Sequence, residues 1–199
     1  KQMESDLDAQ IRALEDFDED PPLEEEDPTD RIAALEQGLP AAASLRDMAS
    51  KAVSQAMDII SKGGAVPVTS IQAAAEKMFQ SINSDPEAML SLTMLKQKDG
   101  QAYIHSTNVS TLLMVMAKTA GMSRSQVLDY GLAGLLHDVG KAKTPRQILM
   151  KKKALDKEEK LLYEHHVTIT NELLSNVYGL SQTVLDAASQ HHERLDGQG

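Results

Sequence analysis

The sequence contains no cysteine and no tryptophan, and only 3% of its 199 residues are aromatic. Without cysteine there can be no disulfide and no thiolate metal site, so any metal must be held by histidine and carboxylate. Alanine, leucine and methionine supply most of the apolar residues, and these favour helices over strands. We therefore expect an all-α protein, with a helical bundle from about Leu45 onward.

Long apolar runs are also missing. No stretch approaches the roughly 20 residues that a membrane-spanning helix needs, and no secretory signal opens the chain. We therefore expect no membrane span and a cytoplasmic location. No basic face stands out, so a nucleic acid polymer is not an expected partner. The chain begins with Lys1 rather than Met, so we expect further sequence upstream.

The net charge of −10 is concentrated in one segment. Residues 15–30 hold ten acidic residues and no Lys or Arg, which leaves 20 acidic and 20 basic residues elsewhere. Because such a stretch cannot bury enough apolar surface to fold, we predict a flexible acidic linker at residues 18–30. A specific acidic docking motif is the alternative. Residues 1–17 carry apolar side chains at helical spacing and predict a short amphipathic helix.

Start and stop signals divide the rest of the chain into helices. An apolar stripe over residues 45–60, which includes Ile59 and Ile60, ends at Gly63-Gly64. Asp85 followed by Pro86 is typical of an N-cap and a first helical residue, and Ser181 is expected to open the last helix. Three pairs match the capping-box pattern: Thr69 with Gln72, Ser123 with Gln126, and Asp156 with Glu159.

These signals predict two helical regions. Residues 31–80 are expected to form a helical stalk or docking layer, joined by the acidic linker to an upstream module. Residues 81–199 are expected to form the functional domain, and one of its helices should run from Asp156 to about Asn176. A homodimer is one assembly that the N-terminal helices would allow.

All six histidines lie beyond residue 104, on four successive predicted helices: His105, His137, His165, His166, His191 and His192. His137 is followed at once by Asp138, at a predicted helix end. Imidazole and carboxylate suit Fe, Mn, Co, Ni or Zn, and a carboxylate can bridge two metals. Helical bundles often gather such ligands from facing helices. The alternative is that each histidine is an ordinary core or surface residue, but chance rarely confines them to one half in this order.

The histidine pattern resembles the HD superfamily, and within it the HD-GYP phosphodiesterases. Residues 137–141, HDVGK, match the HD-x-GK element, and residues 191–199, HHERLDGQG, match the HHExxDGxG run that leads into Tyr-Pro in those proteins. His105 fits the first-ligand helix. The resemblance covers about residues 81–199 and implies an HD-type helical bundle, preceded here by the N-terminal helices and the linker.

The resemblance implies two divalent metal ions, Fe or Mn, with Asp138 as the bridging and catalytic carboxylate. Gln101 replaces the Glu that some members use for a third metal. The alignment with the family favours His166 as the ligand. Because neighbouring residues on a helix point about 100° apart, we do not expect the adjacent His165 to bind the same site. The full implied ligand set is His105, His137, Asp138, His166, His191 and His192.

Two basic residues are implied to serve the substrate. Lys141 is expected to act in catalysis by holding a phosphate oxygen as a point charge, with a solvated helix-end lysine as the alternative. Arg194 is expected to reach a substrate phosphate, with a surface arginine as the alternative.

The implied function is a metal-dependent phosphodiesterase that hydrolyses cyclic di-GMP to linear pGpG, and further to GMP, in bacterial second-messenger signalling. The alternatives are a non-catalytic cyclic-dinucleotide receptor or scaffold, and another HD-superfamily nucleotide phosphohydrolase. Other features also depart from the family pattern. The run ends at Gly199, so the Tyr-Pro and a downstream Asp ligand are expected to follow it. Thr170 stands where a glycine is common, four residues after the third ligand.

Overall fold

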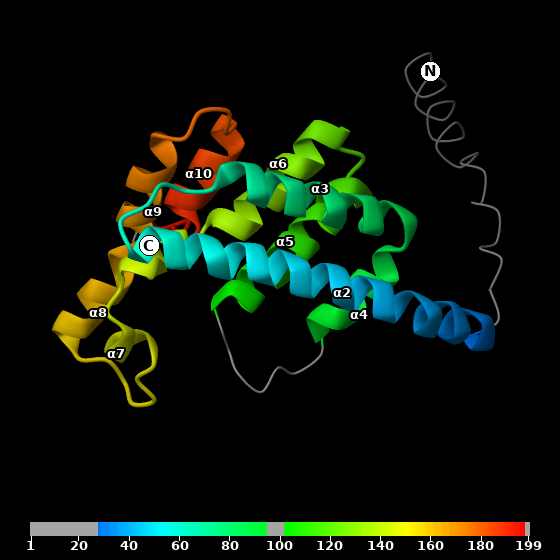
Figure 1. The fold of residues 1–199 in the computed structure, drawn as a ribbon, viewed down its shortest axis with the longest axis horizontal. Coiled ribbons are helices and arrows are strands. Elements are labelled where there is room, and N and C mark those ends of the chain that lie inside the picture. The colour runs from blue at the N-terminus through cyan, green and yellow to red at the C-terminus, as the bar shows by residue number, and fades with distance from the viewer. Residues whose placement is uncertain (1–27, 95–101, 198–199) are drawn as a thin grey trace, which may run out of the picture. The chain divides into compact units, whose positions relative to one another are not determined.

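The computed structural model describes residues 28–94 and 102–197, and every regular element in these ranges is helical. The expectation of an all-α protein is confirmed. The elements in chain order (Figure 1) are α2 (Pro28–Ser61), α3 (Val68–Ser84), α4 (Pro86–Met94), α5 (Ala102–Thr119), α6 (Arg124–Leu136), the 3-10 helix η1 (Val139–Lys143), α7 (Arg146–Leu149), α8 (Lys157–Glu164), α9 (His166–Ser175) and α10 (Gln182–Gln190). None of the helices in these ranges is both long and apolar enough to cross a membrane.

The N-terminal predictions lie mostly outside the described residues. This holds for the amphipathic helix at residues 1–17 and for residues 18–27 of the acidic linker. The linker boundary at residue 30 was wrong, because residues 28–30 already form the first turn of α2. Pro28 suits the first helical position, and Asp30 lies where the positive end of the helix dipole favours an acid.

Residues 35–199 form one unit with a continuous hydrophobic core. From α2 the core takes Ala49, Val53, Ala56 and Ile60, at helical spacing on one face. Ile59, which the predicted stripe included, is 39% exposed because it lies on the neighbouring face. Side chains of α2 and α3 share this core with those of α5, α6, α9 and α10, so the predicted boundary at residue 80 does not separate two cores. A docking role for α2 and α3 stays a prediction.

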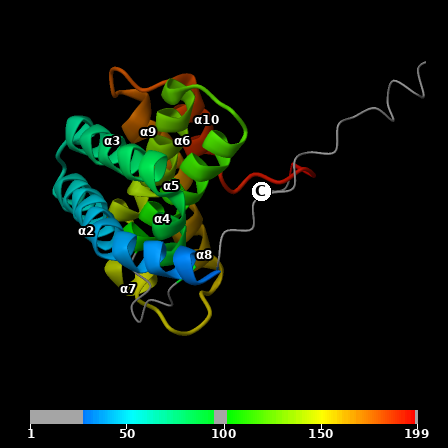
Figure 2. The same cartoon turned by 90° about the vertical axis from the view of Figure 1, so that its right-hand side faces the viewer.

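Close helix contacts hold the centre of the bundle together. On α6, a Cβ at Gly134 would lie 2.4 Å from Ser110 Cα, so the two backbones approach too closely for a side chain there. Ser110 Oγ also donates a hydrogen bond to the Gly131 carbonyl at 2.8 Å. α10 packs against α6 and α9, and α9 packs against η1, so α5, α6, α9 and α10 gather together (Figure 2).

Local capping chemistry explains four of the helix starts, those of α4, α6, α8 and α10. The capping boxes at Ser123 and Asp156 both form, and Ser181 caps α10 by accepting a hydrogen bond from the Val184 N–H. Asp85 Oδ1 accepts from the Ala88 N–H at 3.0 Å, as the Asp-Pro pair predicts. The predicted cap at Thr69 was wrong, because α3 begins at Val68 directly after Pro67 and Thr69 is already inside it.

The single helix predicted from Asp156 to Asn176 is instead two helices, α8 and α9, which meet at His165. Their packing differs. α8 buries none of its residues, whereas α9 buries His166, Thr170 and Leu174. Contact with the core therefore begins where α9 begins, at His166, which is the predicted metal ligand on this helix.

Candidate metal centre

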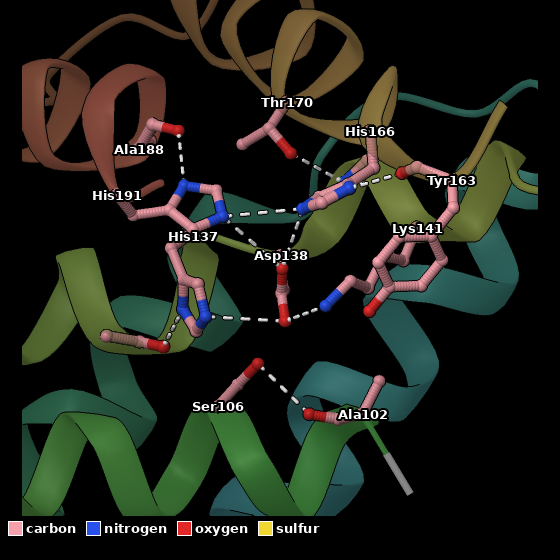
Figure 3. A network of polar contacts seen from close by, with 12 residues as sticks. Ala102, Ser106, His137, Asp138, Lys141, Tyr163, His166, Thr170, Ala188 and His191 are labelled. Carbon is pink, nitrogen blue, oxygen red and sulfur yellow. Dashed lines mark hydrogen bonds and ion pairs between the residues drawn. The ribbon is translucent and has the colours of Figure 1, made fainter. Parts of the chain in front are cut away.

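Four helices deliver the predicted ligands to one place. Figure 3 shows four of them, His137, Asp138, His166 and His191, pointing toward one another. His105 belongs to α5, His137 and Asp138 follow the end of α6, and His166 opens α9. His191 and His192 directly follow α10. Their potential ligand atoms form two groups, each within 4.8 Å: His105, His137 and Asp138 in one, and His166, His191 and His192 in the other. The structure thus brings together all six residues named from the sequence, as groups that could hold metal.

Asp138 lies between the two groups, and its side chain is 2% exposed. Its Oδ1 atom lies 3.2 Å from His166 Nε2 and 3.6 Å from His191 Nε2. Its Oδ2 atom lies 3.3 Å from His137 Nε2 and accepts a 2.6 Å hydrogen bond from Lys141 Nζ. Each carboxylate oxygen therefore faces a different group, which is the arrangement that a bridging ligand needs.

Three imidazoles are oriented by the same backbone contact. The Nδ1 atoms of His137, His166 and His191 lie 2.9, 2.6 and 2.9 Å from the carbonyl oxygens of Gly134, Tyr163 and Ala188, each three residues earlier. A carbonyl only accepts, so each Nδ1 carries the proton. In the neutral imidazole, each Nε2 then presents a lone pair toward the centre, where a metal could accept it. Such outer hydrogen bonds fix the tautomer and ring orientation of metal-binding histidines.

The lone pairs at the centre fit a cation. Within the part of the chain that the structure describes, Asp138 Oδ1 is buried without a hydrogen-bond partner. The nearby Nε2 atoms of His166 and His191 lie 3.3 Å apart. Because these atoms all present lone pairs, a divalent cation between them would replace repulsion with coordination. Imidazole with carboxylate is a donor set that suits Fe and Mn.

The protonation states agree with metal binding. Burial alone would raise the pKa of Asp138, but in the metal-free chain the hydrogen bonds that the imidazoles of His137, His166 and His191 can donate to it hold that pKa well below its ordinary value. The carboxylate is therefore ionised. Burial lowers the pKa of His105 and of His192, and a neighbouring histidine lowers each further. Lowered pKa values favour the neutral imidazole, which is the form that binds metal.

A pocket of about 270 Å³ opens beside this centre. Its polar lining residues are His105, His137, Asp138, Lys141, His191 and His192. The Lys141 side chain is 11% exposed, and its Nζ lies 5.3 Å from the centre of the Tyr163 ring. Lys141 is therefore held between a carboxylate and an aromatic face at the edge of the centre, where an anionic group could meet it.

Two other predicted residues lie elsewhere. Arg194 is outside the pocket lining, and its guanidinium pairs with Asp196 Oδ2 at 2.9 Å in an exposed position. The structure therefore does not bring Arg194 to the centre, although its role toward a substrate stays untested. His165 is exposed and belongs to neither group of potential ligands among the described residues. This agrees with the choice of His166.

Sequence reasoning missed the three carbonyls that orient the imidazoles. A signal was available, because a residue three positions before a helical histidine is placed to accept its Nδ1–H. It also missed Tyr163, whose ring lies under Lys141 and whose carbonyl orients His166.

The HD domain family model matches residues 70–199 of this chain. The chain belongs to the HD domain family. The matched part of the HD domain begins inside α3 and includes both groups of potential ligands. No solved structure gives a significant match.

Several HD domain relatives are similar in sequence. The chain is 33% identical over 172 residues to a cyclic di-GMP phosphodiesterase of Pseudomonas aeruginosa, covering 86% of this chain and 42% of the relative. It is 38% identical over 112 residues to a 3′3′-cGAMP-specific phosphodiesterase of Vibrio cholerae, covering 56% and 26%. It is 35% identical over 115 residues to a cyclic di-GMP phosphodiesterase of Thermotoga maritima, covering 57% and 31%. The chain thus spans less than half of each relative, and these names support the HD-GYP resemblance.

Proposed function

We propose that the chain is the HD-type part of a metal-dependent phosphodiesterase that hydrolyses cyclic di-GMP to linear pGpG, and further to GMP. One observation carries the proposal: the buried Asp138 carboxylate directs its two oxygens to two separate groups of potential metal ligands. The relatives named cyclic di-GMP phosphodiesterase support the choice of substrate.

In the proposed site, His105 and His137 would hold one divalent ion, and His166, His191 and His192 would hold the other, with Asp138 as a ligand common to both. Two such ions, when bound, lower the pKa of water and neutralise charge that develops around phosphorus in an in-line displacement. The backbone carbonyls behind His137, His166 and His191 keep their Nε2 atoms aimed inward. The donor set suits several divalent transition metals, and the preference for Fe or Mn among them is what the HD-GYP resemblance implies.

Lys141 takes the role of the phosphate-binding cation. Its ammonium group lies at the edge of the pocket, beside Asp138, and can reach a non-bridging phosphate oxygen as a point charge. In the reaction, water adds to phosphorus and the P–O3′ bond breaks. The 3′ oxygen leaves as a hydroxyl with a proton taken from that water, and the phosphate stays on the 5′ oxygen, which gives the linear dinucleotide.

A second cyclic dinucleotide has its own support. The relative with 38% identity is named for specificity toward 3′3′-cGAMP, so that substrate is the second candidate. Cyclic di-GMP and 3′3′-cGAMP share the 3′–5′ phosphodiester linkage, and the metal centre proposed here would treat the two phosphates alike. Contacts to the bases must then decide between them.

The test uses the complete protein that carries this chain, loaded with Mn²⁺ or Fe²⁺ and incubated separately with cyclic di-GMP and 3′3′-cGAMP. Chromatography of the products should show linear pGpG from cyclic di-GMP. Metal content is measured on the same sample. A protein that holds two metals and binds cyclic di-GMP without cleaving it would be a receptor or scaffold. Cleavage of mononucleotides but of neither cyclic substrate would indicate another HD phosphohydrolase.

A further inference from the structure

Thr170 connects the two halves of the candidate metal centre through a buried hydrogen bond. It lies on α9, one helical turn after His166, and its side chain is fully buried. Its Oγ1 atom accepts a hydrogen bond from the Gly140 N–H at 2.9 Å (Figure 3). Gly140 lies in η1, two residues after Asp138, so the bond joins segments 30 residues apart in sequence.

The backbones of η1 and α9 lie directly against each other at this bond. A Cβ added to Gly140 would lie 2.1 Å from the His166 carbonyl oxygen and 2.7 Å from the Thr170 nitrogen. No side chain fits between the two segments, so their separation depends on what Thr170 presents to Gly140. A buried N–H that loses its acceptor is costly, which makes the hydroxyl more than a space-filling group.

The same two segments also meet at the metal centre itself. Asp138 Oδ1 lies 3.2 Å from His166 Nε2, and the Gly140–Thr170 bond lies two residues further along η1 and one turn further along α9. The Asp138–His166 contact and the Gly140–Thr170 bond lie at different points along α9. Together they restrain both the rotation of α9 and its distance from η1. Asp138 belongs to the first group of potential ligands and His166 to the second.

We propose that Thr170 is a positioning residue that sets the spacing of the two metal-binding groups through its hydrogen bond to Gly140. The inference rests on the proposed metal site and adds a residue outside its ligands. Loss of an outer-shell partner typically weakens metal binding by about 10- to 100-fold. We expect an effect of this size on the second metal, because the bond acts on the distance between the groups.

Three substitutions separate this role from simple packing. Thr170→Val keeps the branched shape but removes the acceptor, whereas Thr170→Ser keeps the acceptor and removes a methyl group. Thr168→Val makes the same change at an exposed position of the same helix and serves as the matched control. If Thr170→Val fails to fold, Thr170→Ala compared with Thr170→Ser gives the same contrast in hydroxyl content.

The experiment titrates the full chain with Mn²⁺, measures affinity by calorimetry, and records the electron paramagnetic resonance signal of a coupled manganese pair. Thr170→Val should bind the second Mn²⁺ about 10- to 100-fold more weakly, with loss of the coupled signal at metal concentrations that saturate the wild type. Thr170→Ser and Thr168→Val should match the wild type. Faster hydrogen exchange at the Gly140 amide in Thr170→Val would accompany the loss.

Two results would overturn the inference, and they are distinguishable. Unchanged affinity and an unchanged coupled signal in folded Thr170→Val would show that the hydroxyl does not set the spacing. A wild-type chain that binds no pair of Mn²⁺ ions would remove the proposed metal site and this role together, and that failure is visible before any variant is made.

Discussion

The more buried part of the candidate metal centre, here called its floor, consists of His137, Asp138, His166 and His191. Each of these three histidines donates Nδ1–H to a carbonyl three residues earlier, and the Asp138 side chain is 2% exposed. The exposed part, here called its rim, consists of His105 and His192. Side chains that are already oriented lose little freedom when a ligand binds, whereas exposed side chains must still be ordered. The comparison indicates that the floor determines whether metal binds, and that the rim adjusts how tightly.

The sharpest test of the floor is Asp138→Ala against Lys141→Ala. Removing the carboxylate between the two groups should abolish both metal binding and hydrolysis in the complete protein. Removing Lys141 takes away one charge at the pocket edge, and loss of one such electrostatic donor typically costs about 10²–10³ in rate. Steady-state rates with cyclic di-GMP and metal content on the same samples give the comparison.

Circular dichroism of both variants serves as the control. It shows whether each variant is folded, so that a folding defect is not mistaken for lost metal binding. Asp138 would not be a ligand if Asp138→Ala kept both metal and turnover while Lys141→Ala lost turnover. The bridging role proposed for it would then be wrong.

A second test compares floor and rim directly. His166→Gln should weaken Mn²⁺ binding by more than the about 10- to 100-fold typical of an outer-shell loss, because it removes an oriented, fully buried ligand. His192→Gln should stay within that range, because its side chain is exposed. His165→Gln is the matched control, since it changes the neighbouring exposed histidine. An equal effect at His166 and His192 would remove the distinction between floor and rim.

A third test changes the floor without touching a ligand. Gly140→Ala would place a Cβ 2.1 Å from the His166 carbonyl oxygen, so α9 must move away from η1. Overpacking of this kind typically costs about 1–3 kcal/mol of stability. The cost should appear in urea unfolding of the metal-free chain. Ala142→Gly, in the same 3-10 helix, is the comparison variant, because it removes a methyl group where Gly140→Ala adds one. Gly179→Ala does not serve, because the positive φ of Gly179 would add backbone strain.

The parts of this protein that sequence reasoning predicted are those with local causes. The capping boxes at Ser123 and Asp156 involve residues three apart, and both form as predicted. The histidines could be placed on successive helices because helical spacing is also a local property. At Thr69 the local pattern was misleading, since Pro67 already leads into the helix.

The parts that were missed depend on contacts between distant segments. The break at His165 follows from where α9 begins to bury its side chains, which only the folded bundle decides. Thr170 could be recognised from the sequence as a departure from a family pattern, but its partner Gly140 lies 30 residues away. Arg194 pairs with Asp196 outside the pocket, and its role toward a substrate stays a prediction.

The smallest expected effect concerns the rim and the pH dependence of stability. The folded chain lowers the pKa of His105 and of His192 below the ordinary value of 6.5, chiefly through burial. As pH falls through about 6.5, the unfolded chain therefore binds more protons at these positions than the folded chain does. The metal-free protein should lose stability in this range and regain it as pH rises. Asp138 acts in a separate, more acidic window: because its pKa is depressed, its contribution is present above the ordinary carboxyl pKa and is lost progressively as pH falls below it.

Urea unfolding with a chelator present, at pH 5.5 and at pH 7.5, measures this dependence. The double variant His105→Gln with His192→Gln removes both groups and should make the difference between the two pH values smaller, because glutamine does not titrate. Both groups are partly exposed, so solvent screens them and the change should be modest. His165→Gln, at an exposed histidine outside both groups of potential ligands, is the matched variant. If the double variant keeps the full pH dependence, the rim imidazoles do not resist protonation.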